Sequence, residues 1–184
     1  MDNGDAKQQL RRKVSLLKKN YPVEVLAELS GRIHARIEQS PWFRNATRIA
    51  CYHALPGEVQ TVAFLEKWRG EKQIFLPAVD GERLTFYPYQ GESRMKTGSF
   101  GIMEPQGNKE ILLDDIDLAI VPGVAFDRRL NRLGRGKGFY DRFLSEFGKP
   151  VIGICFRFQV FDFVPVDAHD CRMTQVITEQ EIID

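Results

Sequence analysis

The run DLAIV at residues 117–121 gives the clearest indication of the fold. An apolar run of this kind is typical of a strand buried on both faces, as parallel sheets contain. A glycine-rich loop follows it, then a predicted helix over residues 138–147 and a second buried-strand candidate over residues 151–156. Strands that alternate with helices in this way favour an α/β fold.

The same alternation extends in both directions from this run. Leu10, Val14 and Leu17 follow helical spacing, Pro22 is well placed to open a second helix, and Pro41 to close that region. The expected elements are helices over residues 6–19, 22–38 and 62–68, the last capped by Thr61, strands over 48–53, 73–76, 84–87 and 175–178, and a turn at Asp80-Gly81. We expect a single domain over residues 1–184 with a three-layer α/β/α fold, a largely parallel sheet and helices on both faces.

Composition and charge narrow the class of protein. Lys and Arg number 26 against 25 for Asp and Glu, so the net charge of +1 gives no general field for nucleic acid or a membrane. Cys51, Cys155 and Cys171 form no metal-binding spacing and suit small buried side chains in a reducing compartment. No apolar run approaches the roughly 18 residues of a membrane span, and the N-terminus lacks a signal-peptide pattern. We expect a cytoplasmic monomer with no nucleic-acid or membrane partner.

The most informative stretch for function is residues 127–141, DRRLNRLGRGKGFYD. Gly134, Gly136 and Gly138 alternate in it, so backbone N–H groups can converge on an anion beside the N-terminus of a predicted helix. Arg135 and Lys137 can add mobile charge to a phosphate. The cations of the stretch are Arg128, Arg129, Arg132, Arg135 and Lys137.

Chemistry alone leaves three interpretations of this loop open. A glycine-rich turn with solvated arginines is common on protein surfaces, and an arginine cluster can bind nucleic acid, although the near-neutral net charge argues against that. The third interpretation is phosphate or nucleotide binding, for which Phe139 and Tyr140 offer flat surfaces to a ring system. The loop is not a Walker A motif, because G-x-x-x-x-G-K-[ST] is not satisfied.

Together with strings elsewhere in the chain, this loop resembles the 5-formyltetrahydrofolate cyclo-ligase family, also called methenyltetrahydrofolate synthetase. The strings occur in the family's order and cover nearly the whole chain. They are Lys7-x-x-Leu10-Arg11, Leu55-Pro56-Gly57-Glu58-Val59-x-Thr61, Phe100-Gly101-Ile102-x-Glu104-Pro105, Val121-Pro122-Gly123-Val124-Ala125-Phe126-Asp127, Asn131 to Asp141, and Pro165-x-x-x-His169-Asp170.

The resemblance implies an enzyme that takes ATP and a reduced folate as substrates and Mg²⁺ as its metal. The formyl oxygen of 5-formyltetrahydrofolate would accept the γ-phosphoryl group of ATP. N10 of the folate would then close onto the activated carbon, giving 5,10-methenyltetrahydrofolate with release of ADP and phosphate. The protein would act mainly through positioning and charge stabilisation.

The resemblance also implies a role for individual residues, with Lys137 and Arg135 as the catalytic pair. The implied ATP-binding residues are Lys7, Arg11, Arg132, Leu133, Gly134, Arg135, Gly136, Lys137, Gly138, Phe139 and Tyr140. The implied substrate-binding residues are His53, Glu58, Arg135, Gly136, Lys137, Gly138 and Phe139. Phe86 and Phe100 are candidates either for a wall beside the folate ring or for the core.

For the metal, the resemblance implies Asp141 and a second position that falls on Thr174. Thr174 brings a neutral hydroxyl where many relatives have an Asp, and Asp170 lies four residues earlier, away from the matching position. Mg²⁺ takes one or two carboxylates together with substrate phosphates, so one carboxylate is enough. Two rival classes remain open: a non-catalytic nucleotide- or folate-binding module, and an RNA-binding protein that uses the arginine cluster.

Overall fold

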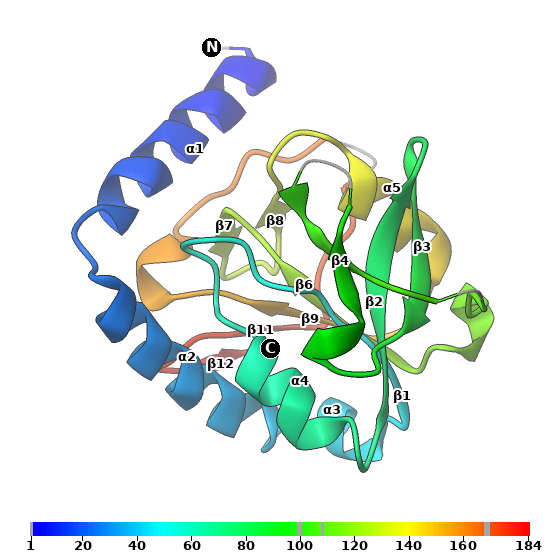
Figure 1. Cartoon of the computed structure of the whole chain (residues 1–184). Coiled ribbons are helices and arrows are strands. Elements are labelled where there is room, and N and C mark those ends of the chain that lie inside the picture. Colours follow the sequence, from blue (N-terminus) through cyan, green and yellow to red (C-terminus); the bar gives the residue numbers. More distant parts are fainter. Residues whose placement is uncertain (1, 99–100, 108, 168–169) are drawn as a thin grey trace.

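The computed structural model describes residues 2–98, 101–107, 109–167 and 170–184. Within them, the main sheet has seven strands in the order β12-β11-β9-β6-β1-β2-β3 (Figure 1). Strands β11, β9, β6, β1 and β2 run parallel, and each edge strand is antiparallel to its neighbour. The bounds are β1 Arg48–Ala50, β2 Gln73–Asp80, β3 Arg83–Pro88, β6 Leu118–Pro122, β9 Val151–Ile154, β11 Gln175–Ile177 and β12 Ile182–Ile183. The prediction of a largely parallel sheet is confirmed.

Helices cover both faces of this sheet, as the alternation along β6 requires. Leu118 and Ile120 pack on one face with residues of α2, α3 and α4, whereas Ala119 and Val121 pack on the other face with residues of α5. Figure 1 shows α2, α3 and α4 together on one side and α5 on the other. The helix bounds are α1 Asn3–Lys18, α2 Val23–Ile37, α3 Pro41–Asn45, α4 Val62–Trp68 and α5 Phe139–Phe147. The α/β/α layering is therefore confirmed.

Two local predictions about helix ends were wrong. Pro41 does not close the helical region but occupies the first turn of α3, where its missing N–H has no intrahelical partner to lose. Thr61 stands directly before α4 but makes no side-chain cap, because its hydroxyl bonds to the loop after β1 instead. Among the helices of the described residues, none is long and apolar enough to cross a membrane.

Short strands and turns beyond the main sheet were not predicted. The bounds are β4 Met95–Thr97, β5 Met103–Pro105, β7 Ala125–Asp127, β8 Arg132–Leu133 and β10 Val160–Phe161, with 3₁₀ turns η1 Glu92–Arg94, η3 Leu113–Asp115 and η4 Arg157–Gln159. Strands β10, β7 and β8 form a three-stranded sheet, and β4 pairs with β5. These elements are too short to show a period in the sequence.

A ring packed against two glycines ties the small sheet to the main one. The Phe126 side chain of β7 is fully buried, and a Cβ built on Gly123 would lie 2.4 Å from its ring. A Cβ built on Gly153 of β9 would also lie 2.4 Å from that ring. Both distances are too short for any side chain, so glycine at these positions lets the ring seat against the strand ends.

Candidate functional site

A cavity of about 410 Å³ opens at the carboxyl ends of β1 and β6. This is the edge at which open α/β sheets hold their ligands, and the volume is within the range of small-molecule sites. The lining residues are Tyr52, His53, Leu55, Glu58, Pro77, Val79, Leu84, Ile102, Met103, Pro122, Gly123, Val124, Arg132, Gly134, Arg135, Gly136, Lys137, Gly138, Phe139, Tyr140 and Asp141. The predicted glycine-rich loop, His53, Glu58 and Asp141 are thus brought to one place.

The loop after β1 is fixed by its own hydrogen bonds. The Thr61 hydroxyl donates to the Tyr52 carbonyl oxygen at 2.7 Å and accepts from the Ala54 N–H at 3.1 Å. Leu55-Pro56-Gly57-Glu58 closes a turn in which the Glu58 N–H donates to the Leu55 carbonyl oxygen at 3.0 Å. Gly57 has φ +77°, which suits glycine at the third position of a type II turn. This turn sets the Glu58 carboxylate on the cavity wall.

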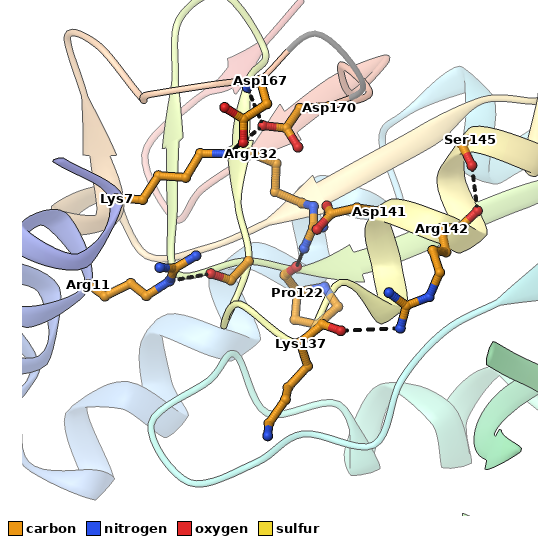
Figure 2. A network of polar contacts seen from close by, with 11 residues as sticks. Lys7, Arg11, Pro122, Arg132, Lys137, Asp141, Arg142, Ser145, Asp167 and Asp170 are labelled. Carbon is orange, nitrogen blue, oxygen red and sulfur yellow. Dashed lines mark hydrogen bonds and ion pairs between the residues drawn. The ribbon is translucent and has the colours of Figure 1, made fainter. Parts of the chain in front are cut away.

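The glycine-rich loop is held by its carbonyl groups from two sides. The Arg11 guanidinium of α1 donates through Nε to the Gly134 carbonyl oxygen at 2.9 Å (Figure 2). On the other side, Arg142 donates to the carbonyl oxygen of Lys137 at 3.2 Å and to that of Glu82 at 2.7 Å. Gly136 and Gly138 take φ of +97° and +73°, which non-glycine residues rarely adopt.

This geometry leaves donors of the loop for a ligand. Among the described residues, the backbone N–H groups of Arg135, Gly136 and Gly138 enter no hydrogen bond. Gly138 is also the residue before the first turn of α5, whose helix dipole places partial positive charge at the same point. An anion with several oxygens is the ligand that such a loop accommodates.

Arg132 is buried, unlike the other cations of the loop, and its guanidinium is bound by other groups of the protein. Its guanidinium donates to the Pro122 carbonyl oxygen at 3.1 Å and forms an ion pair with Asp141. It also lies over the Tyr140 ring, with its central carbon 5.5 Å from the ring centroid. Figure 2 shows Arg132 pointing to Asp141 while Lys137 extends away from both. Arg132 therefore fixes Asp141 and supports the floor of the cavity.

Glu58 and Arg135 are paired with one another across the cavity. The Arg135 guanidinium donates to Glu58 Oε1 through Nη2 at 2.8 Å and through Nε at 3.1 Å. The Leu55 N–H donates to the other oxygen, Oε2, at 3.0 Å. The carboxylate predicted for folate and an arginine predicted for ATP thus contact each other directly.

Four predicted residues, Lys7, Arg11, Leu133 and Thr174, lie outside the cavity lining. Lys7 binds Asp167 and Asp170 at 2.6 and 2.8 Å (Figure 2), and although burial alone would lower the pKa of Lys7, these carboxylates raise it. Leu133 is buried in a small core cluster with Val14 of α1. The Leu133 side chain is therefore a packing residue, and Lys7 joins α1 to the C-terminal segment.

Thr174, the second predicted metal position, is also placed elsewhere. Its hydroxyl accepts from the Val151 N–H at 2.9 Å, and its own N–H donates to the Val151 carbonyl oxygen at 2.7 Å. These contacts lie where β9 begins, at the amino ends of the parallel strands, whereas the cavity lies at their carboxyl ends. The structure thus places Thr174 away from Asp141 and the cavity lining, at a position where it aligns β11 with β9.

His53 does line the cavity, and a polar network lies behind it. Its Nε2 is 3.3 Å from Glu92 Oε1, and the Tyr89 hydroxyl donates to the same Glu92 oxygen at 3.0 Å. That hydroxyl also contacts Glu66 at 2.6 Å. The network therefore holds the His53 ring at the cavity wall.

Two phenols in the cavity lining remain neutral: Tyr52, which is buried, and Tyr140, which is partly buried. Burial, with smaller contributions from Glu58 and Cys51, raises the pKa of Tyr52 and of Tyr140 well above the usual range of a tyrosine. The Tyr52 hydroxyl donates to the Val59 carbonyl oxygen at 3.1 Å. Both phenols therefore stay protonated at neutral pH, and the Tyr140 hydroxyl can donate a hydrogen bond to a ligand in the cavity.

The apolar wall of the cavity was not found from the sequence. It comes from the β2–β3 hairpin, through Pro77, Val79 and Leu84, and from Met103 of β5 with the preceding Ile102. Nothing in the spacing of these residues separates them from ordinary strand positions. Phe86 belongs to the core beside Phe143, so it does not wall the cavity, and Phe100 and His169 lie outside the described residues.

Over most of its length the chain is similar to proteins of one family. A model of the 5-formyltetrahydrofolate cyclo-ligase family matches residues 3–179. A 5-formyltetrahydrofolate cyclo-ligase of Haemophilus influenzae is 31% identical over 188 residues, covering 95% of this chain and 98% of the relative. The structure of Aquifex aeolicus 5,10-methenyltetrahydrofolate synthetase superposes with a TM-score of 0.87 at 34% identity, covering 96% of this chain and 91% of the other. A Mycoplasma pneumoniae synthetase shares the fold, with a TM-score of 0.73 at 23% identity, over 97% of this chain and 99% of the other.

Proposed function

This chain belongs to the 5-formyltetrahydrofolate cyclo-ligase family, and on that premise we propose that it cyclises 5-formyltetrahydrofolate to 5,10-methenyltetrahydrofolate with ATP and Mg²⁺. The observation that carries the proposal is a single cavity that joins an anion-binding glycine loop, a carboxylate and an apolar wall. The formyl oxygen, a poor leaving group, accepts the γ-phosphoryl group and becomes a good one. N10 then attacks the activated carbon, and ADP and phosphate are released.

The two substrates use different parts of the cavity. The N–H groups of the loop bind phosphate oxygens, and Arg135 and Lys137 stabilise the negative charge of the transferring group. Glu58 accepts hydrogen bonds from the N–H groups of the pterin ring, which packs against the apolar wall and Phe139. The main contribution to rate is then the fixed position of the formyl oxygen beside the γ-phosphate.

The residues around Asp141 suit a magnesium ion that enters with the nucleotide. Among the described residues, no three acidic, histidine or cysteine side chains gather as a metal site. Asp141 Oδ1 is paired with Arg132, while Oδ2 makes no hydrogen bond within the described residues, so one oxygen remains for a cation. Mg²⁺ commonly binds through one carboxylate, water and substrate phosphates, and it would neutralise charge on the phosphate oxygens.

The proposal is tested by following the absorbance of methenyltetrahydrofolate after mixing the protein with ATP, Mg²⁺ and 5-formyltetrahydrofolate. Product is expected only when all three are present, with one ADP formed per turnover. A folded preparation that forms no product, or forms it without ATP, would contradict the proposal. Nucleotide binding without turnover would indicate the non-catalytic module instead.

Asp141→Asn is expected to weaken the binding of Mg²⁺ to the protein–nucleotide complex by about 10-fold or more, because the cation loses its charged ligand. Calorimetric titration of Mg²⁺ in the presence of a non-hydrolysable ATP analogue measures the change without turnover. Thermal unfolding must accompany it, since Arg132 also loses its partner. Asp115→Asn, an exposed carboxylate paired with Arg48, is the matched control. Equal metal affinity in Asp141→Asn and wild type would show that Asp141 is not a ligand.

A further inference from the structure

In the Glu58–Arg135 ion pair, the two side chains bind each other with the same groups that the proposed function assigns to the two substrates. Oε1 of Glu58 accepts two N–H groups from Arg135, and Oε2 accepts one from Leu55. A carboxylate offers about four acceptor positions, so three are filled in this state. The N–H groups of a pterin ring can therefore bind the Glu58 carboxylate fully only after Arg135 has moved away from it.

The two partners differ in how readily they move. Glu58 is fixed by the Leu55 N–H within a closed turn, and 9% of its side chain is exposed. Arg135 stands between Gly134 and Gly136, and 53% of its side chain is exposed. Because half of this side chain lies in solvent, rotation about its own bonds can take the guanidinium away from Glu58 while the loop backbone stays in place. When the pair opens, the arginine is therefore the partner that leaves.

Glu58 would retain a positive neighbour after Arg135 has left. Lys18, at the end of α1, lies beside the turn, with Nζ 3.8 Å from the position of a Cβ built on Gly57. Burial lowers the pKa of the Lys18 ammonium, the Glu58 carboxylate raises it and Arg135 lowers it further. Departure of Arg135 removes its repulsion on Lys18, so the Glu58 carboxylate keeps a positive neighbour while it binds the ligand.

We propose that Arg135 exchanges the Glu58 carboxylate for a nucleotide phosphate, so that nucleotide binding prepares Glu58 to receive the folate. The inference rests on the proposed function, because it takes a phosphate and a pterin as the two ligands. The phosphate carries more charge than a carboxylate and offers the bidentate geometry that a guanidinium favours. One ion pair then couples two adjacent binding sites, and the coupling acts equally in both directions.

The test is a binding experiment that needs no turnover. The dissociation constant of 5-formyltetrahydrofolate is measured by calorimetry with and without Mg²⁺ and a non-hydrolysable ATP analogue. The wild type is expected to bind the folate about 5- to 10-fold more tightly with the analogue present, within the usual range of coupling between sites. The analogue must bind more tightly with folate present by the same factor. In Arg135→Gln, the ratio of the folate dissociation constants without and with the analogue is expected to fall below about 2-fold.

The experiment compares the ratio of dissociation constants, so an equal loss of affinity in both conditions in Arg135→Gln does not affect the result. Arg83→Gln, an exposed arginine facing Glu146, is the matched control and must keep the wild-type ratio. Wild-type protein without coupling, or coupling that survives Arg135→Gln, would overturn the exchange while leaving the proposed function intact. Wild-type protein that binds no folate under either condition would overturn both.

Discussion

Replacement of Lys137 by alanine is expected to lower kcat by about 10²-fold or more while the KM for ATP changes far less. Lys137 stands between Gly136 and Gly138 in the cavity lining. Under the proposed function the loop N–H groups would bind the ground-state phosphate, and the Lys137 ammonium would matter most when negative charge builds up on the transferring group. Steady-state kinetics with varied ATP separate the two constants.

Lys149→Ala is the matched control, because its ammonium contacts the carbonyl oxygen of Asp114 outside the cavity. This variant is expected to keep wild-type kinetics. Near-normal kcat in Lys137→Ala would show that Lys137 is a solvated loop residue. A rise in KM with kcat unchanged would assign it to ground-state binding alone.

Asp127→Ala is expected to lower the free energy of unfolding by about 4 kcal/mol, because buried donors lose their acceptor. The fully buried Asp127 carboxylate accepts from the N–H groups of Arg129, Asn131 and Val164 and from the Asn131 side chain. It also holds a turn in which Leu130 has φ +67°, a strained value for leucine. Chemical denaturation measures the loss, which corresponds to roughly 10 °C in Tm.

The exposed carboxylate of Asp115, paired with Arg48, again provides the comparison. Asp115→Asn is expected to change stability by less than about 0.5 kcal/mol. If Asp127→Ala unfolds at the same denaturant concentration as Asp115→Asn, the four hydrogen bonds at Asp127 contribute little. The turn before the glycine-rich loop would then be held by other contacts.

The fold was predictable where burial is uniform along an element. The run at residues 117–121 became β6, because a strand buried on both faces excludes polar residues throughout. The strand expected over residues 48–53 ends at Ala50, and Tyr52 and His53 beyond it line the cavity. Strands of two or three residues, such as β8 and β10, depend on tertiary packing and leave no local pattern.

The site was predictable where the backbone imposes a residue type. Gly136 and Gly138 take positive φ, and that requirement is visible in the sequence as alternating glycines. The sequence did not show which side chains pair with one another. Nothing in the sequence distinguishes Arg132, buried against Asp141, from Arg135, which is half-exposed, because burial of a cation is decided by distant segments.

Attachment of α1 has a consequence for synthesis of the chain. Lys7 contacts Asp170, 163 residues later, and Arg11 contacts the loop at Gly134. At about 5 to 20 residues per second, a ribosome takes roughly 8 to 30 seconds to make that stretch. Helix α1 therefore has its full docking surface only after Asp170 has emerged. Until Ala125, Leu133 and Val164 have been made, the apolar side of α1, including Val14, stays exposed to solvent or to a chaperone.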